Sequence, residues 1–244
     1  MKRPIALVAA AALASGLFAV VPAVSAQAAP VCEDPEHPIN TDSNTGYSVE
    51  LGTTKTQKLH LVVYTNDGCD VTGAKAEVTW PHGSKKVTLH KLVLASGLVR
   101  WDGDLKVSPK SLRNSDAGVW PTTFTVTGAH TDTLTVNSSA LRRSRLSFNA
   151  GPEPVRDGKI TFAGKLERAN WNTHTYRGYS QPVEISYTFD DDAGDTVATP
   201  TTKANGTYRV TRALPGYGDY QAFFHGNGTT GPRNSTVDSI RSAR

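Results

Sequence analysis

The seven histidines are the side chains best suited to acid–base chemistry or zinc binding, and their spacing supports neither. They lie at positions 37, 60, 82, 90, 130, 174 and 225, without a His-x-His or His-Glu-x-x-His pattern. The Gly-x-Ser-x-Gly elbow of many serine hydrolases is also absent. Composition leaves open a Ser-His-Asp triad assembled by the fold, and His174 with a nearby acidic residue is the first pair to inspect. The sequence predicts a chain that is not an enzyme and needs no cofactor.

The most concentrated carboxylates are three aspartates at 190–192, followed by Asp195. Counted from Asp190, the fifth position is a glycine and the twelfth a threonine, so the ligand spacing of an EF-hand is not met. A charged hairpin tip is the favoured interpretation. Asp190, Asp192 and Asp195 remain weak candidates for a surface calcium site.

Three aromatic side chains lie in a polar stretch, residues 169–181, that we expect to form a long connection between strands. They are Trp171, Tyr176 and Tyr179. Exposed rings at the rim of a sandwich can stack on sugars or anchor a protein partner. Packing in the core is the favoured alternative, and the three rings are kept as candidate ligand-binding residues.

The first 28 residues have the layout of a secretory signal. Lys2 and Arg3 precede an apolar run, residues 5–21, and small residues at alternate positions follow Pro22. The run is shorter and richer in alanine than a membrane span. We therefore expect residues 1–28 to be cleaved and the mature chain to be secreted, extracellular and without a membrane span.

The charge balance gives little support for a nucleic-acid partner. Cleavage would remove two basic residues, leaving 24 basic against 22 acidic side chains and a net charge of +2. A nucleic-acid-binding face needs a strong cluster of positive charge, so we expect no such partner. The one local cluster, Arg142, Arg143 and Arg145, is interpreted as a solvated linker.

The two cysteines, Cys32 and Cys69, are expected to pair, because an exported chain folds in oxidising surroundings. Closing the loop between them would stabilise the fold by roughly 3–4 kcal/mol on the chain-entropy model. Redox or metal chemistry would favour a Cys-x-x-Cys spacing, which is absent.

Alternation of apolar and polar residues, the pattern of half-buried strands, runs through most of the mature chain. It occurs at 59–63, 76–80, 123–127, 133–136, 160–166, 183–189, 207–211 and 220–225, and further strand-like segments lie at 87–94 and 98–107. Turn signals separate these segments. The pattern predicts an all-β chain with little helix, folded as two antiparallel β-sandwich domains, residues 29–140 and 141–244, with the boundary near 138–145.

Residues 114–120, Asn-Ser-Asp-Ala-Gly-Val-Trp, resemble the Asp-x-Gly-x-Tyr corner before strand F of immunoglobulin-like (Ig-like) domains. Trp120 stands where tyrosine is usual, so an indole N–H replaces the hydroxyl. The cysteine of true Ig domains would fall at Thr122, so the inter-sheet disulfide is missing.

The second half is similar to a module of secreted actinobacterial proteins. The matching stretches are residues 164–171, 175–179, 218–224 and 226–240. This resemblance implies an exported protein with one or more Ig-like units and no assigned activity.

Export, the strand pattern and the lack of a catalytic motif favour a secreted, non-catalytic tandem of Ig-like domains. Its partner would be a cell-surface, polysaccharide or protein ligand. The alternative is a small secreted hydrolase or hydrolase inhibitor that works through loop residues. A cleft holding a close His–carboxylate or Asp–Asp pair would favour that alternative.

Overall fold

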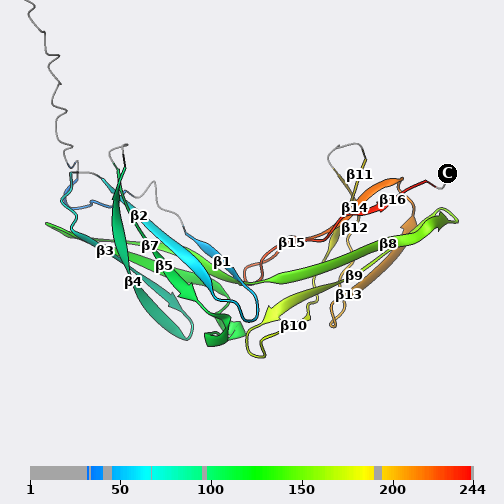
Figure 1. Ribbon diagram of the computed structural model, residues 1–244, viewed down its shortest axis with the longest axis horizontal. Coiled ribbons are helices and arrows are strands. Elements are labelled where there is room, and N and C mark those ends of the chain that lie inside the picture. The colour runs from blue at the N-terminus through cyan, green and yellow to red at the C-terminus, as the bar shows by residue number, and fades with distance from the viewer. Residues whose placement is uncertain are drawn as a thin grey trace, which may run out of the picture.

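The computed structural model describes residues 32, 34–40, 46–66, 68–94, 98–189 and 194–242, so the predicted signal at 1–28 lies outside the described residues. Strands occupy most of this chain in two groups that meet at an angle (Figure 1). The described residues also form two short 3-10 turns, η2 (Pro109–Ser111) and η3 (Asn114–Asp116). The prediction of an all-β fold with little helix is confirmed.

None of the helical turns in the described ranges has the length or the apolar character that a membrane span requires.

The first sandwich contains seven strands. They are β1 (Ser48–Leu51), β2 (Gln57–Asn66), β3 (Gly73–Trp80), β4 (Gly83–Val93), β5 (Leu98–Val107), β6 (Gly118–Thr127) and β7 (Thr131–Arg142). Their hydrogen-bonded order is β1-β7-β6-β3-β4-β5-β2. The β1–β7 pair is parallel and the others are antiparallel. Strand β4 belongs to both layers, because its first part pairs with β3 and residues 90–93 pair with β5.

The second sandwich contains nine strands. They are β8 (Ser144–Arg156), β9 (Lys159–Asn170), β10 (Thr175–Gly178), β11 (Glu184–Thr188), β12 (Asp195–Ala198), β13 (Thr207–Ala213), β14 (Gly218–Phe224), β15 (Arg233–Asn234) and β16 (Asp238–Ile240). In one layer β9 pairs with β8 on one side and with β10 and β13 on the other. The second layer has the order β12-β11-β14-β15, with β16 also on β14.

The alternating side chains fill two separate cores, as the period-two pattern predicts. Leu59, Leu61 and Val63 on β2 are buried in the first. Ile160 and Phe162 on β9 are buried in the second. His60, between Leu59 and Leu61, is exposed. Each sandwich has its own apolar interior.

In both sandwiches an aromatic side chain near the start of a strand forms a hydrogen bond to the turn that precedes the strand. The indole Nε1–H of Trp120 donates to the carbonyl of Asp116 at 2.6 Å, and the hydroxyl of Tyr220 donates to the carbonyl of Gly216 at 2.7 Å. Each bond reaches four residues back, and both rings are fully buried. The indole thus does the work of the usual tyrosine. The φ of Gly118, +128°, is one that side chains rarely adopt, so this corner needs glycine there.

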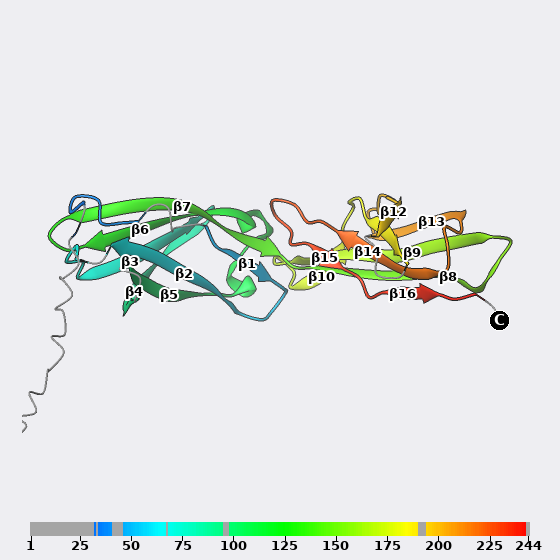
Figure 2. The ribbon, with the colours of Figure 1, turned by 90° about the horizontal axis from the view of Figure 1, so that it is seen from above.

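The segment predicted to be a solvated linker is instead part of the β structure, and that prediction was wrong. Only Arg143 separates β7 from β8. Its N–H donates to the carbonyl of Leu51 at 2.8 Å, and its own carbonyl accepts from Ala169 at 2.9 Å. Arg142 is buried, and its backbone N–H donates to the carbonyl of Thr229 at 3.0 Å. Seen from above, one nearly continuous ribbon passes between the sandwiches (Figure 2).

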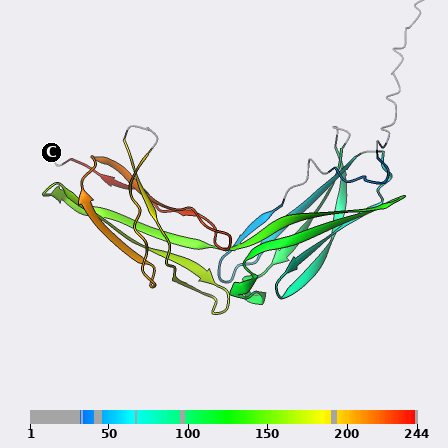
Figure 3. The ribbon, with the colours of Figure 1, turned by 180° about the vertical axis from the view of Figure 1, so that it is seen from behind.

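Trp171 of the second sandwich is buried in the core of the first. Together with Ala169 it belongs to the first apolar cluster. Its indole Nε1–H lies 3.0 Å from the carbonyl of Gly52 and 3.4 Å from that of Leu51, and its backbone N–H donates to Oδ1 of Asn114 at 2.8 Å. The turn between β9 and β10 therefore lies against the η2–η3 segment (Figure 3). This contact fixes the two sandwiches to each other.

Replacing Trp171 with alanine should destabilise the first sandwich, although Trp171 belongs to the second in sequence. Removal of a fully buried tryptophan costs about 3–5 kcal/mol, here by opening the base of the first core. Urea unfolding followed by a probe in the first sandwich measures this loss. Tyr217→Ala, at an exposed ring, is the control. An equal loss of unfolding free energy in the two variants would contradict the burial of Trp171 in the first core.

Tyr220→Phe should cost about 1 kcal/mol, because it leaves the carbonyl of Gly216 without its donor and changes no other packing atom. Chemical denaturation of this variant beside Tyr187→Phe tests it, since the Tyr187 hydroxyl donates from an exposed position to the carbonyl of Tyr217. A smaller loss for Tyr220→Phe than for Tyr187→Phe would argue against the corner bond.

Candidate functional site

The three candidate ligand-binding aromatics surround the junction of the sandwiches. Trp171 has no exposed surface and is committed to packing, so it is not available to stack on a ligand. The expected long connection that was to present these rings is a hairpin of β9 and β10 with a turn at 171–174. The cross-strand pairing of β10 with the end of β9 brings Tyr176 opposite Ala169.

Tyr176 and Tyr179 each carry an arginine on one ring face. The guanidinium carbon of Arg145 lies 3.5 Å from the centroid of Tyr176, and that of Arg168 lies 3.8 Å from the centroid of Tyr179. Such cation–π contacts stabilise both partners. Phe224 contacts Tyr179 edge-on at 5.9 Å. These faces are therefore occupied, and ligand binding by Tyr176 and Tyr179 stays a prediction.

Of the three weak calcium candidates, Asp190 and Asp192 lie outside the described residues. Asp195 begins β12 and is exposed. Within the described ranges no three His, Cys, Asp or Glu side chains come together as a metal site would require. The calcium site stays a prediction. The predicted disulfide between Cys32 and Cys69 is confirmed.

Close histidine–carboxylate pairs do occur, though not at His174. Nδ1 of His82 lies 2.5 Å from Oδ1 of Asp116, and Nε2 of His225 lies 2.7 Å from Oε2 of Glu184. His174 has a left-handed φ of 53° in the β9–β10 turn and forms no ion pair with a described residue. The sequence offers no signal for these pairs, because their partners are 34 and 41 residues apart.

The hydroxyl groups around these pairs are placed differently from those of a nucleophilic triad. In a triad the imidazole accepts the nucleophile's proton while the carboxylate holds the other ring nitrogen. Here Thr196 donates at 2.7 Å, and Ser186 at 3.2 Å, to Oε1 of Glu184. Asp116 is buried and accepts the N–H of Arg113 at 2.7 Å, so it closes the η3 turn. Both carboxylates serve local structure.

A third pair belongs to a charged network on the open face of β2 and β5. Nδ1 of His60 lies 3.0 Å from Oδ1 of Asp104, whose other oxygen accepts from Lys58 at 2.6 Å. The hydrogen bond from Lys58, followed by that from His60, holds the pKa of Asp104 below its ordinary value. Nε2 of His60 faces Nη2 of Arg100 at 2.9 Å. Both ring nitrogens are thus engaged by charged groups, and neither meets a hydroxyl.

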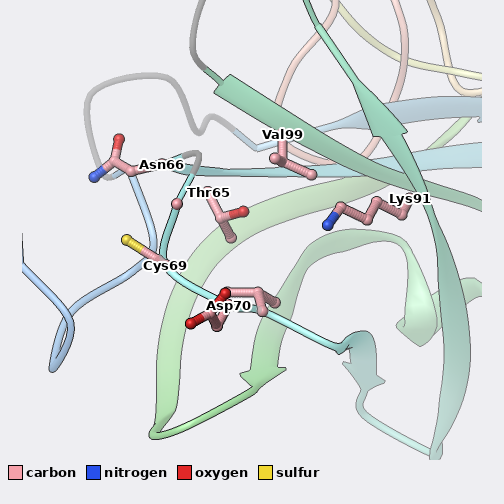
Figure 4. A pocket seen from close by; sticks show the side chains of 8 residues that line it. Thr65, Asn66, Cys69, Asp70, Lys91 and Val99 are labelled. Atoms are coloured by element: carbon pink, nitrogen blue, oxygen red, sulfur yellow. The ribbon is translucent and has the colours of Figure 1, made fainter. Parts of the chain in front are cut away.

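The hollow beside Lys58 of this network measures about 410 Å³, but it is wide open to solvent and is lined by Thr56, Gln57, Lys58 and Lys106, with no histidine or carboxylate. Two other cavities are smaller. One of about 100 Å³ is lined by Thr65, Asn66 and Cys69 together with Lys91 and Val99 from the neighbouring strands (Figure 4). Another, of about 130 Å³, lies between the stacked rings of Trp80 and Trp120 and the η2 turn. Pockets that enclose small-molecule ligands usually measure about 300–1,000 Å³. Neither cavity is lined by a histidine.

No family model and no curated protein matches this chain. Among solved structures, the crystal structure of the first two Ig domains of DIP-gamma (IG1+IG2) is similar to 82% of this chain and 96% of that chain, with 10% identity and a TM-score of 0.26. At this identity and score the likeness carries no functional argument. The β-sandwich assignment rests on the strands, their order and their cores described above.

The Glu184 cluster should make the second sandwich sensitive to acid. Hydrogen bonds from Thr196 and then His225 lower the pKa of this carboxyl from 4.5. Because the folded pKa is the lower one, the stabilisation is complete above the ordinary value and is lost as the pH falls through the folded value. Melting temperatures between pH 7 and pH 3 should therefore fall less steeply for Glu184→Gln. Glu36→Gln, at an exposed glutamate, should leave the profile unchanged.

Proposed function

We propose that the protein is a secreted, non-catalytic binding module of two Ig-like domains, residues 29–140 and 141–244. Its ligand would be a polysaccharide or a protein at a cell surface. The observation that carries this proposal is the fixed junction, in which Trp171 of one sandwich is buried in the other. Two sandwiches held in one orientation can present a surface that spans both. Binding to that surface does not have to restrict the motion of one sandwich relative to the other, so less conformational entropy is lost.

Ion pairs support the same rigidity. Oε2 of Glu50, on β1, lies 3.0 Å from Nη2 of Arg233, on β15, and 3.9 Å from Nε of Arg143. The Nε–H of Arg233 also donates to the carbonyl of Ser144 at 3.2 Å. Partly buried pairs that share one carboxylate hold their geometry better than single exposed pairs. The hydrogen bonding of each histidine–carboxylate pair described above favours binding over catalysis.

Retention tests this proposal directly. The purified protein is incubated with cell-wall material, with insoluble polysaccharides and with immobilised surface proteins, and the bound fraction is measured. We expect retention on one of these materials. Trp171→Ala should weaken it at a temperature where both sandwiches remain folded, and Tyr217→Ala should not. Retention on none of the materials would contradict the proposal, and release of sugars or peptides from them would favour a hydrolase.

A further inference from the structure

Two guanidinium groups lie at the base of the second sandwich without a carboxylate. Arg142 is only 6% exposed, and Arg168 is partly buried beneath Tyr179. Four other arginines have a carboxylate oxygen within 4 Å; these are Arg100, Arg143, Arg233 and Arg241. Within the described residues, neither Arg142 nor Arg168 forms such a pair. Burying a charge without a counterion is costly.

The electrostatics of the two groups are consistent with a missing anion. Burial, followed by the like charge of Arg168, lowers the pKa of Arg142 to about 10, and Tyr179 opposes this shift. Burial also lowers the pKa of Arg168, and only the neighbouring Tyr179 opposes this. For each guanidinium the effect of burial exceeds that of Tyr179, and no carboxylate of the described chain lies within 4 Å of either group.

Unused hydrogen-bond donors lie at the same place. Nε of Arg142 and Oγ1 of Thr230 are buried and have no hydrogen-bond partner among the described residues. The two residues are neighbours, because the backbones of Arg142 and Thr230 form a parallel bridge. Buried polar atoms are almost always satisfied by protein, water or a ligand. Guanidinium N–H groups and a threonine hydroxyl can all donate to the oxygens of one anion.

We propose that Arg142, Arg168 and Thr230 form a site for a tetrahedral oxyanion, a sulfate or phosphate group. A guanidinium engages such a group through two parallel N–H bonds. Two guanidiniums on different strands can contact more oxygens than a carboxylate offers. The group is either a free ion or a substituent of an acidic polysaccharide. The free-ion site stands independently of the binding function proposed above.

Thermal unfolding in sulfate or phosphate, with chloride replacing either salt at equal ionic strength, tests the site. A ligand that binds only the folded state raises the melting temperature with its concentration. We expect this rise for the wild type and at least a tenfold weaker apparent affinity for Arg142→Met. Arg145→Met, three positions away and exposed, should keep the wild-type response. Arg142→Met should also unfold no earlier than the wild type in chloride, because it removes an unpaired buried charge.

Sulfate also stabilises proteins generally by exclusion from their surface. An equal rise in the wild type, Arg142→Met and Arg145→Met would therefore overturn the proposal, and so would an equal rise with acetate. Arg168→Lys provides a second variant, which keeps the charge and loses the paired N–H groups.

Dextran sulfate, compared with unmodified dextran, separates the two sources of the anion. Retention of the wild type on the sulfated polymer, lost in Arg142→Met, identifies a polymer-borne group. A response to free sulfate alone identifies a free ion. Failure of the cell-wall retention test with a positive sulfate response would remove the proposed function and leave this site intact.

Discussion

The burial of Trp171 in the first core is the interaction on which the rest of the arrangement depends. An indole is the largest apolar side chain, and here it seals the open base of a sandwich that is formed by other residues. Its N–H is satisfied by the carbonyl of Gly52, so the burial leaves no unpaired polar group. Without this contact the first core would be open to water at the junction, and the second sandwich would be held mainly by the β7–β8 strand.

The two sandwiches have the same kind of corner, formed with different aromatic residues. A strand that enters the core from a turn must bury a ring and also satisfy its polar atom. Trp120 and Tyr220 both do so by donating to a carbonyl four residues upstream. Because the geometry of the backbone sets the distance, either an indole or a phenol can serve. The shared bond explains why a chain without the Ig disulfide still forms a well-defined corner.

The strands were predictable from sequence because a half-buried strand imposes a period of two on its side chains. That periodicity is a local property, and it correctly marked β2, β6, β9 and β14. The residues of the junction were not predictable in this way. Arg142 lies in a charged, Ser-rich segment, and only pairing with residues far along the chain buries it. The direction in which Trp171 points is likewise decided by residues far away in sequence, because its indole contacts Leu51 and Gly52, 120 and 119 positions earlier. The histidine–carboxylate pairs were not predictable for the same reason, because the folded chain brings together residues that are far apart in sequence.

Cys69 of the disulfide belongs to the segment between β2 and β3. That segment lies at the end of the first sandwich away from the junction, while β16 lies near the far end of the second (Figure 1). Tension applied between Cys32 and β16 would therefore run the whole length of the molecule, through the strands that cross the junction. The covalent bond shields the 37 positions from Cys32 to Cys69 from stretching. At roughly 3.4 Å per residue, the disulfide prevents on the order of 125 Å of extension. Under tension, the strand pairing outside the disulfide loop and the contact of Trp171 with the first core would break, while β1 and β2 would remain inside the closed loop.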